Sequence, residues 1–458
     1  DHDPDHDPDH DPDHDPDHQD ERIFSLSDSD AFSLEGSYSL DAGWLRGIDY
    51  FARYTDYSLT EQHAEPDHAE PDHDHEEPTV FENEAIEVGA ILDLTNSLFS
   101  QKLALNFSDE EMAIDGEESF MNPTEDSMFS AGYYISKDFD FFHLDFGVRH
   151  DVIKRKGSVS HHDDEDPHDP DHDPDHDPDH DPDHDPDHDP DHADEIDYFD
   201  KTLHNTSFAL MFGIDITEMA QLSLGFSSVE RAPSVVELFM NGPHLSTSRY
   251  EVGNTSLNSE RANNVDVSID YQNNGYEAKL TYYANHIDNY IYLLDDLEDD
   301  DHGGLIRADY LQQDAEFKGY ELSLRKVFKL GNGNLTLSAS RDAVRAKFTD
   351  GSDVPRIIPT RNIYSVLYTS DRDLRVKLSL KDVEKQKNIG VAETATDGYE
   401  MLDFNLAKKF RLNSRNEVTL SVFANNLLDK VARNHTSFVK EAVPLAGRNF
   451  GIKLRFRM

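Results

Sequence analysis

The chain has 458 residues, a formal net charge of −54, a mean hydropathy of −0.72 and no cysteine. The lack of Cys excludes disulfide bonds, thiolate metal sites and Cys nucleophiles. Taken alone, so acidic a composition would indicate a soluble or disordered protein, and we expect no nucleic-acid partner for it.

The charge and the histidines are concentrated in three segments. Residues 1–20, 61–77 and 161–197 contain no Lys or Arg, and they hold 37 of the 95 acidic residues and 18 of the 25 His residues. The remaining chain has an ordinary composition. We therefore interpret residues 1–20 as a His/Asp-rich loop with a truncated start, and 61–77 and 161–197 as inserts in a scaffold that spans 21–458.

The scaffold contains repeated stretches in which apolar and polar residues alternate. They occur at 142–148, 265–271, 374–380, 418–424 and 450–458. In the last stretch the apolar side chains share one face, and Lys453, Arg455 and Arg457 share the other. No apolar run approaches the roughly 20 residues of a membrane helix, but barrel strands need only about 10 alternating residues.

Short turns alternate with long polar connections along the chain. The short turns are 138–140, 273–275, 330–334, 371–373 and 412–416, and the long connections are 59–79, 109–126, 154–197, 230–260, 384–398 and 426–447. Short turns at one end and long loops at the other are typical of an outer-membrane barrel. We predict an all-β, transmembrane antiparallel β-barrel with about 17 strands. The alternative, a soluble β-sandwich, would leave sheet edges unprotected.

Several motifs resemble the barrel signatures of TonB-dependent receptors. They are Phe226-Ser-Ser-Val-Glu-Arg-Ala-Pro-Ser-Val-Val-Glu-Leu-Phe239, Tyr250-Glu-Val-Gly-Asn-Thr-Ser-Leu-Asn-Ser-Glu260, and Phe423-Ala-Asn-Asn-Leu-Leu-Asp429 with Pro444-Leu-Ala-Gly-Arg-Asn-Phe450. Within this region, Asn241-Gly-Pro-His-Leu-Ser-Thr247 is most similar to zinc-uptake receptors of the ZnuD type. The chain departs from the family at Met458, where the family usually ends in an aromatic residue.

The resemblance implies a bacterial outer-membrane barrel of about 22 strands around an N-terminal plug, driven by the TonB complex. A run of 17 strands that ends in the periplasm would correspond to the sixth to the twenty-second. We therefore expect the plug, the TonB box and the first five strands to lie outside this sequence. We also expect a monomer that contacts outer-membrane lipid and lipopolysaccharide, with the His-rich loops on the extracellular side.

The repeat Asp-His-Asp-Pro, in 1–18 and 169–192, offers one imidazole and two carboxylates per unit. These donors suit Zn²⁺, with Ni²⁺, Co²⁺ and Cu²⁺ as competitors. Regular Pro favours an extended chain, and at about 3.1 Å per residue successive His would lie roughly 12 Å apart. We expect many weak, exchangeable sites that collect ions. The alternative is a harmless solvated loop produced by repeat slippage.

The candidate ligands in the inserts are histidines, joined by Asp74 in the shorter insert. In 61–77 the spacing is less regular and could fold around an ion more tightly; in 161–197 the first candidates precede and enter the repeat. The two sets are His63, His68, His73 and His75, and His161, His162, His168, His172 and His176. Capture should fail as these side chains protonate below about pH 6.5.

A tighter site is expected deeper, where the plug meets the barrel. His244 is the barrel candidate, because it occupies the family's Gly-x-His-x-x-Thr-like position in a long outer loop. Glu82 or Glu84 would supply a carboxylate. The alternative for His244 is a hydrogen-bonded loop residue without a ligand role. His286, His302 and His435 are expected to be structural or loop residues.

No catalytic constellation stands out, and we expect no enzyme. Glu230 and Arg231, which lie in the first family motif, could be mistaken for an acid–cation catalytic pair; we interpret them as residues that form ion pairs in the barrel wall. The function predicted is TonB-dependent import of a divalent metal, zinc first. One alternative is haem uptake, because Arg231-Ala-Pro233 and Asn254-Thr-Ser-Leu257 partly resemble haem-receptor motifs with His244 between them. Another is a surface metal-buffering or adhesion protein without transport.

Overall fold

A computed structural model describes residues 23–40, 43–63, 78–116, 119–161, 195–297, 304–413 and 416–457. In these residues a single sheet contains 19 strands, accompanied by one short α-helix and one 3-10 turn. The strands of the wall are β1 (Ile23–Ser39), β2 (Gly47–His63), β3 (Thr79–Asp93), β4 (Ser100–Asp115), β5 (Thr124–Asp138), β6 (Phe142–His161), β7 (Glu195–Thr217), β8 (Ala220–Arg231), β11 (Glu260–Asn273), β12 (Tyr276–Asp295), β13 (Ile306–Lys329), β14 (Gly333–Phe348), β15 (Arg361–Ser370), β16 (Leu374–Val383), β17 (Tyr399–Arg411), β18 (Glu417–Asn425) and β19 (Asn449–Arg457).

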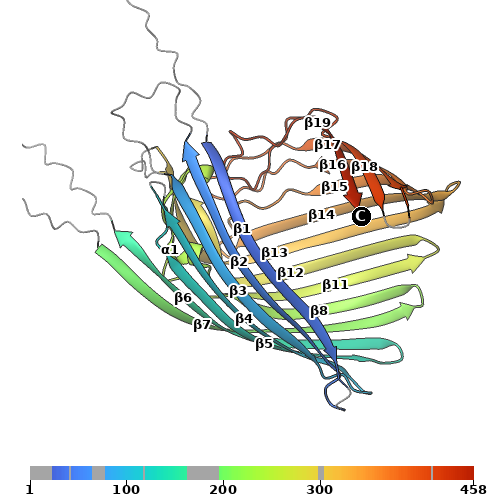
Figure 1. Cartoon of the computed structure of the whole chain (residues 1–458), viewed down its shortest axis with the longest axis horizontal. Helices are drawn as coiled ribbons and strands as arrows, with labels where there is room; N and C mark the ends of the chain where they lie inside the picture. Colours follow the sequence, from blue (N-terminus) through green and yellow to red (C-terminus); the bar gives the residue numbers. More distant parts are fainter. Residues whose placement is uncertain are drawn as a thin grey trace, which may run out of the picture.

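These wall strands follow one another in chain order, each antiparallel to the next. Figure 1 shows them as one curved wall from blue β1 to red β19. The two remaining strands, β9 (Asn241–His244) and β10 (Arg249–Val252), belong to the connection between β8 and β11. Without them the 19 strands reduce to 17. The predicted fold class and strand number are thus confirmed in the described part of the chain.

The two faces of the wall differ as the alternation predicts. Val267 on β11 lies opposite Leu224 on β8 and Tyr282 on β12, so apolar side chains line up across neighbouring strands. On β19, Ile452 and Leu454 are 75% and 70% exposed to solvent. So large an apolar surface indicates a lipid-facing side. Among the described residues, no helix has the length and hydropathy needed to cross a membrane.

Long and short connections lie at opposite ends of the wall, as predicted. The predicted boundaries of the largest one, 154–197, were wrong in one respect. β6 continues to His161 and β7 begins at Glu195, and residues 154–161 pair in register with 195–202. These residues are too polar to show the apolar alternation from which strands were predicted. Backbone pairing nevertheless extends the hairpin beyond the apolar band.

The buried core lies at the end of the wall that carries the long connections. Helix α1 (Val235–Phe239) is capped by Ser234, whose hydroxyl accepts a hydrogen bond from the backbone N–H of Glu237, while the Glu237 carboxylate accepts one from the backbone N–H of Ser234. Leu238 and Phe239 are fully buried there, in a cluster with Ile114, Met121, Leu257 and Ile291. The β8–β11 connection is therefore folded into the mouth of the barrel (Figure 1).

The orientation of the wall can be tested by adding charge to one face at a time. Val267→Arg places a cation on the outward apolar face and should destabilise the barrel by about 2–4 kcal/mol if the site is near the bilayer midplane. Asp266→Arg, on the opposite face, should cost less than half as much. Urea-induced unfolding in lipid vesicles measures both values. Equal losses would contradict the assignment of the outward face to lipid.

Candidate functional site

The candidate site is built on the β9–β10 hairpin, in which His244 pairs with Arg249. A 3-10 turn (Leu245–Thr247) joins the two strands, and Ser248 closes it in the left-handed region with φ of 55°. Gly242 lies directly against the backbone of Phe120, where an added Cβ would be 2.6 Å from the Phe120 Cα. The Gly-Pro-His segment can therefore approach Ser119 and Phe120 only without a side chain at position 242.

His244 is held by a carboxylate on the facing strand. Its Nδ1 lies 2.8 Å from Oε1 of Glu251, and the Thr247 hydroxyl donates to the same oxygen at 2.8 Å. The Tyr310 hydroxyl lies 3.5 Å from the other carboxylate oxygen. Glu251 is only 3% exposed. Burial, the largest single effect, would raise the pKa of Glu251, but the hydrogen bonds from His244 and Thr247 and the electrostatic attraction of His244 and Arg249 together lower it.

This arrangement determines which ring nitrogen of His244 is available. An ionised carboxylate can only accept hydrogen bonds, so Nδ1 carries a proton, and in the neutral ring Nε2 is then the nitrogen with the lone pair. In the described part of the chain, Nε2 has no hydrogen-bond partner, and the side chain is 31% exposed. The ring of Phe120 stacks on the imidazole, with centroids 5.1 Å apart. A His whose Nδ1–H is held by a carboxylate is the usual preparation of an imidazole for metal binding through Nε2.

A second set of charges fixes the hairpin from its other side. The Arg249 guanidinium donates to Asp295 from Nε at 2.8 Å and from Nη2 at 2.5 Å, and both side chains are buried. Arg356 donates to the same carboxylate at 3.0 Å. The Phe438 ring lies 4.4 Å from the Cζ of Arg249 and 3.6 Å from that of Arg356. The Asp295 carboxylate therefore lies where four segments of the mouth meet: β10, the end of β12, and the connections that carry Arg356 and Phe438.

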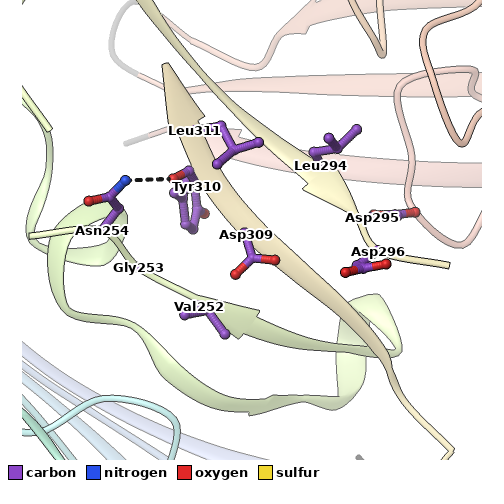
Figure 2. A pocket seen from close by; sticks show the side chains of 9 residues that line it. All are labelled: Val252, Gly253, Asn254, Leu294, Asp295, Asp296, Asp309, Tyr310 and Leu311. Carbon is purple, nitrogen blue, oxygen red and sulfur yellow. Dashed lines mark hydrogen bonds between the residues drawn. The ribbon is translucent and has the colours of Figure 1, made fainter. Parts of the chain in front are cut away.

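A cavity of about 460 Å³ lies beside this network. Figure 2 shows that its lining comes from the end of β10 and the residues after it, from the end of β12 and from β13. The Asn254 side chain bridges two of these walls by donating to the Tyr310 carbonyl at 3.3 Å. The Asp309 carboxylate in the lining pairs with Arg307 at 3.1 Å. The cavity is thus adjacent to the hairpin, but His244 is not part of its lining.

His435, predicted to be structural, lies at the centre of another buried group. Its side chain is fully buried, and Nδ1 lies 2.9 Å from the Thr396 hydroxyl and 3.5 Å from Lys440 Nζ. Its Nε2 lies 3.5 Å from Glu393, without a hydrogen bond. Because an ammonium only donates, Nδ1 acts as acceptor and the ring is neutral. Burial lowers the pKa of His435, and Lys440 and Arg356 lower it further against the opposing effect of Glu393.

The two predicted carboxylates are not brought to His244. Glu82 and Glu84 lie on the outward face of β3, with the exposed positions of that strand. Phe81, on the opposite face, contacts Phe120 at 5.8 Å between ring centroids, and Phe120 stacks on His244. Glu82 and Glu84 instead line an outward groove of about 580 Å³ together with Glu111, Glu125, Lys156 and Asp200. Alternation along β3 thus separates these carboxylates from the hairpin.

Two of the histidines predicted as ligands in the inserts lie within the described residues, and the others lie outside them. His63 and His161 are the last residues of β2 and β6, so both inserts leave from the end of the wall that carries the hairpin. The other predicted ligands lie outside the described residues; they are His68, His73, His75, His162, His168, His172 and His176. Residues 1–20 also lie outside them.

The ion pairing predicted for the first family motif is confirmed. Arg231 pairs with Glu260 at 2.7 Å and with Glu237 at 2.9 Å, and Glu230 pairs with Arg261. Sequence reasoning missed Glu251 as the partner of His244, although their separation of seven residues around a turn is compatible with a hairpin. Within the described ranges, no group of three or more His, Asp or Glu side chains forms a complete metal site. His244 can therefore supply one ligand, but not a whole coordination shell.

Comparison with known proteins gives a consistent result. The family described as "TonB dependent receptor-like, beta-barrel" matches residues 1–427. Among solved structures, the copper transporter OprC is similar with a TM-score of 0.69 and 16% identity, over 94% of this chain and 65% of that one. The Serratia marcescens haemophore receptor HasR, solved with its haemophore HasA and haem, gives 0.65 and 16%, over 95% and 66%. The FrpB iron transporter from Neisseria meningitidis gives 0.61 and 14%, over 93% and 62%. The chain spans less than two thirds of each.

The buried His435 predicts a pH dependence of stability. In the unfolded chain it would titrate near its ordinary pKa of about 6.5. Because the folded state binds this proton only at lower pH, the free energy of unfolding should fall as pH drops below about 6.5 and level off below the lowered pKa. Thermal unfolding at pH 7.5 and 5.5 should show a smaller pH effect in His435→Gln than in the parent. Identical pH effects in both proteins would contradict this role.

Proposed function

The chain belongs to the TonB-dependent receptor family, and we propose that it imports a divalent metal ion, with zinc as the first candidate. Members of this family are transporters of the bacterial outer membrane and are not enzymes. The observation that supports the metal proposal is the free Nε2 of His244, held in place by a buried carboxylate at the mouth of the barrel. Imidazole nitrogen suits Zn²⁺ among the common divalent ions.

The proposed sequence of events begins at the surface. The His/Asp-rich tracts collect ions weakly, and their negative charge raises the local cation concentration. His244 then contributes one ligand to a tighter site in the mouth. Since the described residues provide no complete site around it, the remaining ligands would come from a plug inside the barrel. Force from the TonB complex on that plug would release the ion into the lumen.

The identity of the metal rests on the donor set. The chain has no Cys, and its eight Met residues form no cluster. Cu⁺ prefers such sulfur ligands, whereas imidazole and carboxylate suit Zn²⁺, Ni²⁺, Co²⁺ or Cu²⁺. OprC is named as a copper transporter. An identity of 16% shows only that the fold is similar, so the metal proposed for this chain rests on its own donor residues.

Haem uptake is the second candidate, and one observation favours it. A single imidazole with a free Nε2 could serve as an axial ligand of haem iron, and the similar receptor HasR was solved with haem. A Soret band that appears on adding haem and disappears in His244→Ala would support this alternative. A non-transporting metal-buffering or adhesion protein is the third. It would bind zinc at the surface and show no TonB-dependent uptake.

Replacement of His244 tests the tight site. Isothermal titration of the intact protein with Zn²⁺ should show several weak sites and one tight site. His244→Ala should weaken the tight site by at least about 10-fold, because one direct ligand is lost. His286→Ala is the matched control, since His286 is exposed and pairs with Asp288 at 3.2 Å. An unaltered tight site in His244→Ala would refute the assignment.

Deletion of the longest repeat tests ion collection. Removing 161–192 takes away nine His residues and should reduce the number of weak Zn²⁺ sites while leaving the tight site in place. Because weak sites act by raising the local ion concentration, uptake should fall mainly at low external Zn²⁺. Titration and TonB-dependent uptake of radioactive zinc measure the two effects. An unchanged number of sites would show that the repeat does not collect metal.

A further inference from the structure

We propose that Glu251 is a positioning residue that prepares His244 for metal binding by fixing the proton on Nδ1 and the orientation of the ring. This role rests on the proposed function of His244 and deepens it. The geometry is a carboxylate and an imidazole on facing strands of one hairpin, 2.8 Å apart. One member of the pair is buried, and the other is partly exposed.

Glu251 is suited to positioning rather than to direct metal binding. Its Oε1 accepts hydrogen bonds from both His244 and Thr247, and its Oε2 faces the Tyr310 hydroxyl at 3.5 Å. With a side chain 4% exposed, it offers little access to an incoming ion. Its charge therefore acts through the imidazole. A carboxylate behind a ligating His fixes the tautomer and increases the basicity of the ring.

The strand that carries Glu251 is itself held rigidly. Arg249, two residues earlier and on the same face of β10, is locked to Asp295 by two hydrogen bonds. β10 also pairs in parallel with β13, where Glu251 lies opposite Ala308, a fully buried residue. The backbone from which the Glu251 carboxylate extends is consequently fixed in position. The imidazole orientation is thus set before any ion arrives, which reduces the entropic cost of binding.

A double-mutant cycle tests this role, with Zn²⁺ alone as the probe and the tight-site dissociation constant of the intact protein as the readout. Glu251→Ala should weaken binding by about 10–100-fold, the usual effect of losing such a partner. Combined with His244→Ala, it should cause no further loss, because Glu251 acts only through His244. Additive losses would show that Glu251 binds the metal or acts independently, and would overturn the positioning role.

Two further outcomes separate this proposal from the function on which it rests. If His244→Ala weakens the tight site but Glu251→Ala does not, the positioning role fails and the metal proposal stands. If His244→Ala has no effect, both fail. Glu251→Gln serves as a conservative variant, because its amide oxygen can still accept from Nδ1–H. It should retain binding within about 10-fold of the parent, and a loss as large as that of Glu251→Ala would contradict tautomer control.

A spectroscopic measurement distinguishes positioning from a general structural effect. In the protein labelled with ¹⁵N-histidine, the His244 signal, assigned by its absence in His244→Ala, should report the Nδ1–H tautomer without metal. That tautomer should persist in Glu251→Gln and be lost, or mixed with the Nε2–H form, in Glu251→Ala. A pure Nδ1–H signal in Glu251→Ala would overturn the proposal, even if binding had weakened.

Discussion

Every backbone N–H and C=O group of a strand in lipid must bond to a neighbouring strand, because the hydrocarbon offers no partner. In the described part of the chain, 17 strands meet this requirement by pairing in sequence, except along the outer edges of β1 and β19, which pair only with β2 and β18. Successive side chains point alternately to lipid and to the lumen. Val267 and Ile452 can only face outward, and the charged network around Arg231 can only lie on the other face or in the mouth. Which face of the wall each side chain points to therefore follows from its place in the alternation.

The side chains of the long connections do not follow this alternation. The β8–β11 connection contains apolar residues of its own. Leu238 and Phe239 are buried against residues of nearby strands and connections, among them Ile114 of β4 and Ile291 of β12. That burial carries the β9–β10 hairpin into the mouth. The ion pairs of Arg249 with Asp295 and of Arg356 with the same carboxylate then tie the hairpin to other connections. His244 is consequently presented by a rigid support rather than by a free loop.

The fold could be predicted from the sequence because alternation and turn length are local signals. The predicted strand boundaries were wrong at residues 154–161, which pair with 195–202. Nothing in the sequence indicated this pairing, because polar residues can pair through the backbone without any apolar pattern. His244 was found through its motif, but Glu251 was not, since a hydrogen bond across a hairpin depends on a register that the sequence does not display. Glu82 and Glu84 were expected near the site; their parity on β3 turns them outward. His435 was expected to be a structural or loop residue. The sequence could not show which charges surround it, because Glu393, Lys440 and Arg356 come from three separate connections.

The proposed function depends most on His244 Nε2 as a metal ligand. The direct measurement is an anomalous difference map, collected at the zinc absorption edge from crystals of the intact receptor soaked in Zn²⁺. A peak about 2.0–2.1 Å from Nε2, with the Nδ1–Glu251 hydrogen bond preserved, is the predicted result. Peaks confined to the surface tracts, or a peak bound to the Glu251 carboxylate with His244 turned away, would contradict it.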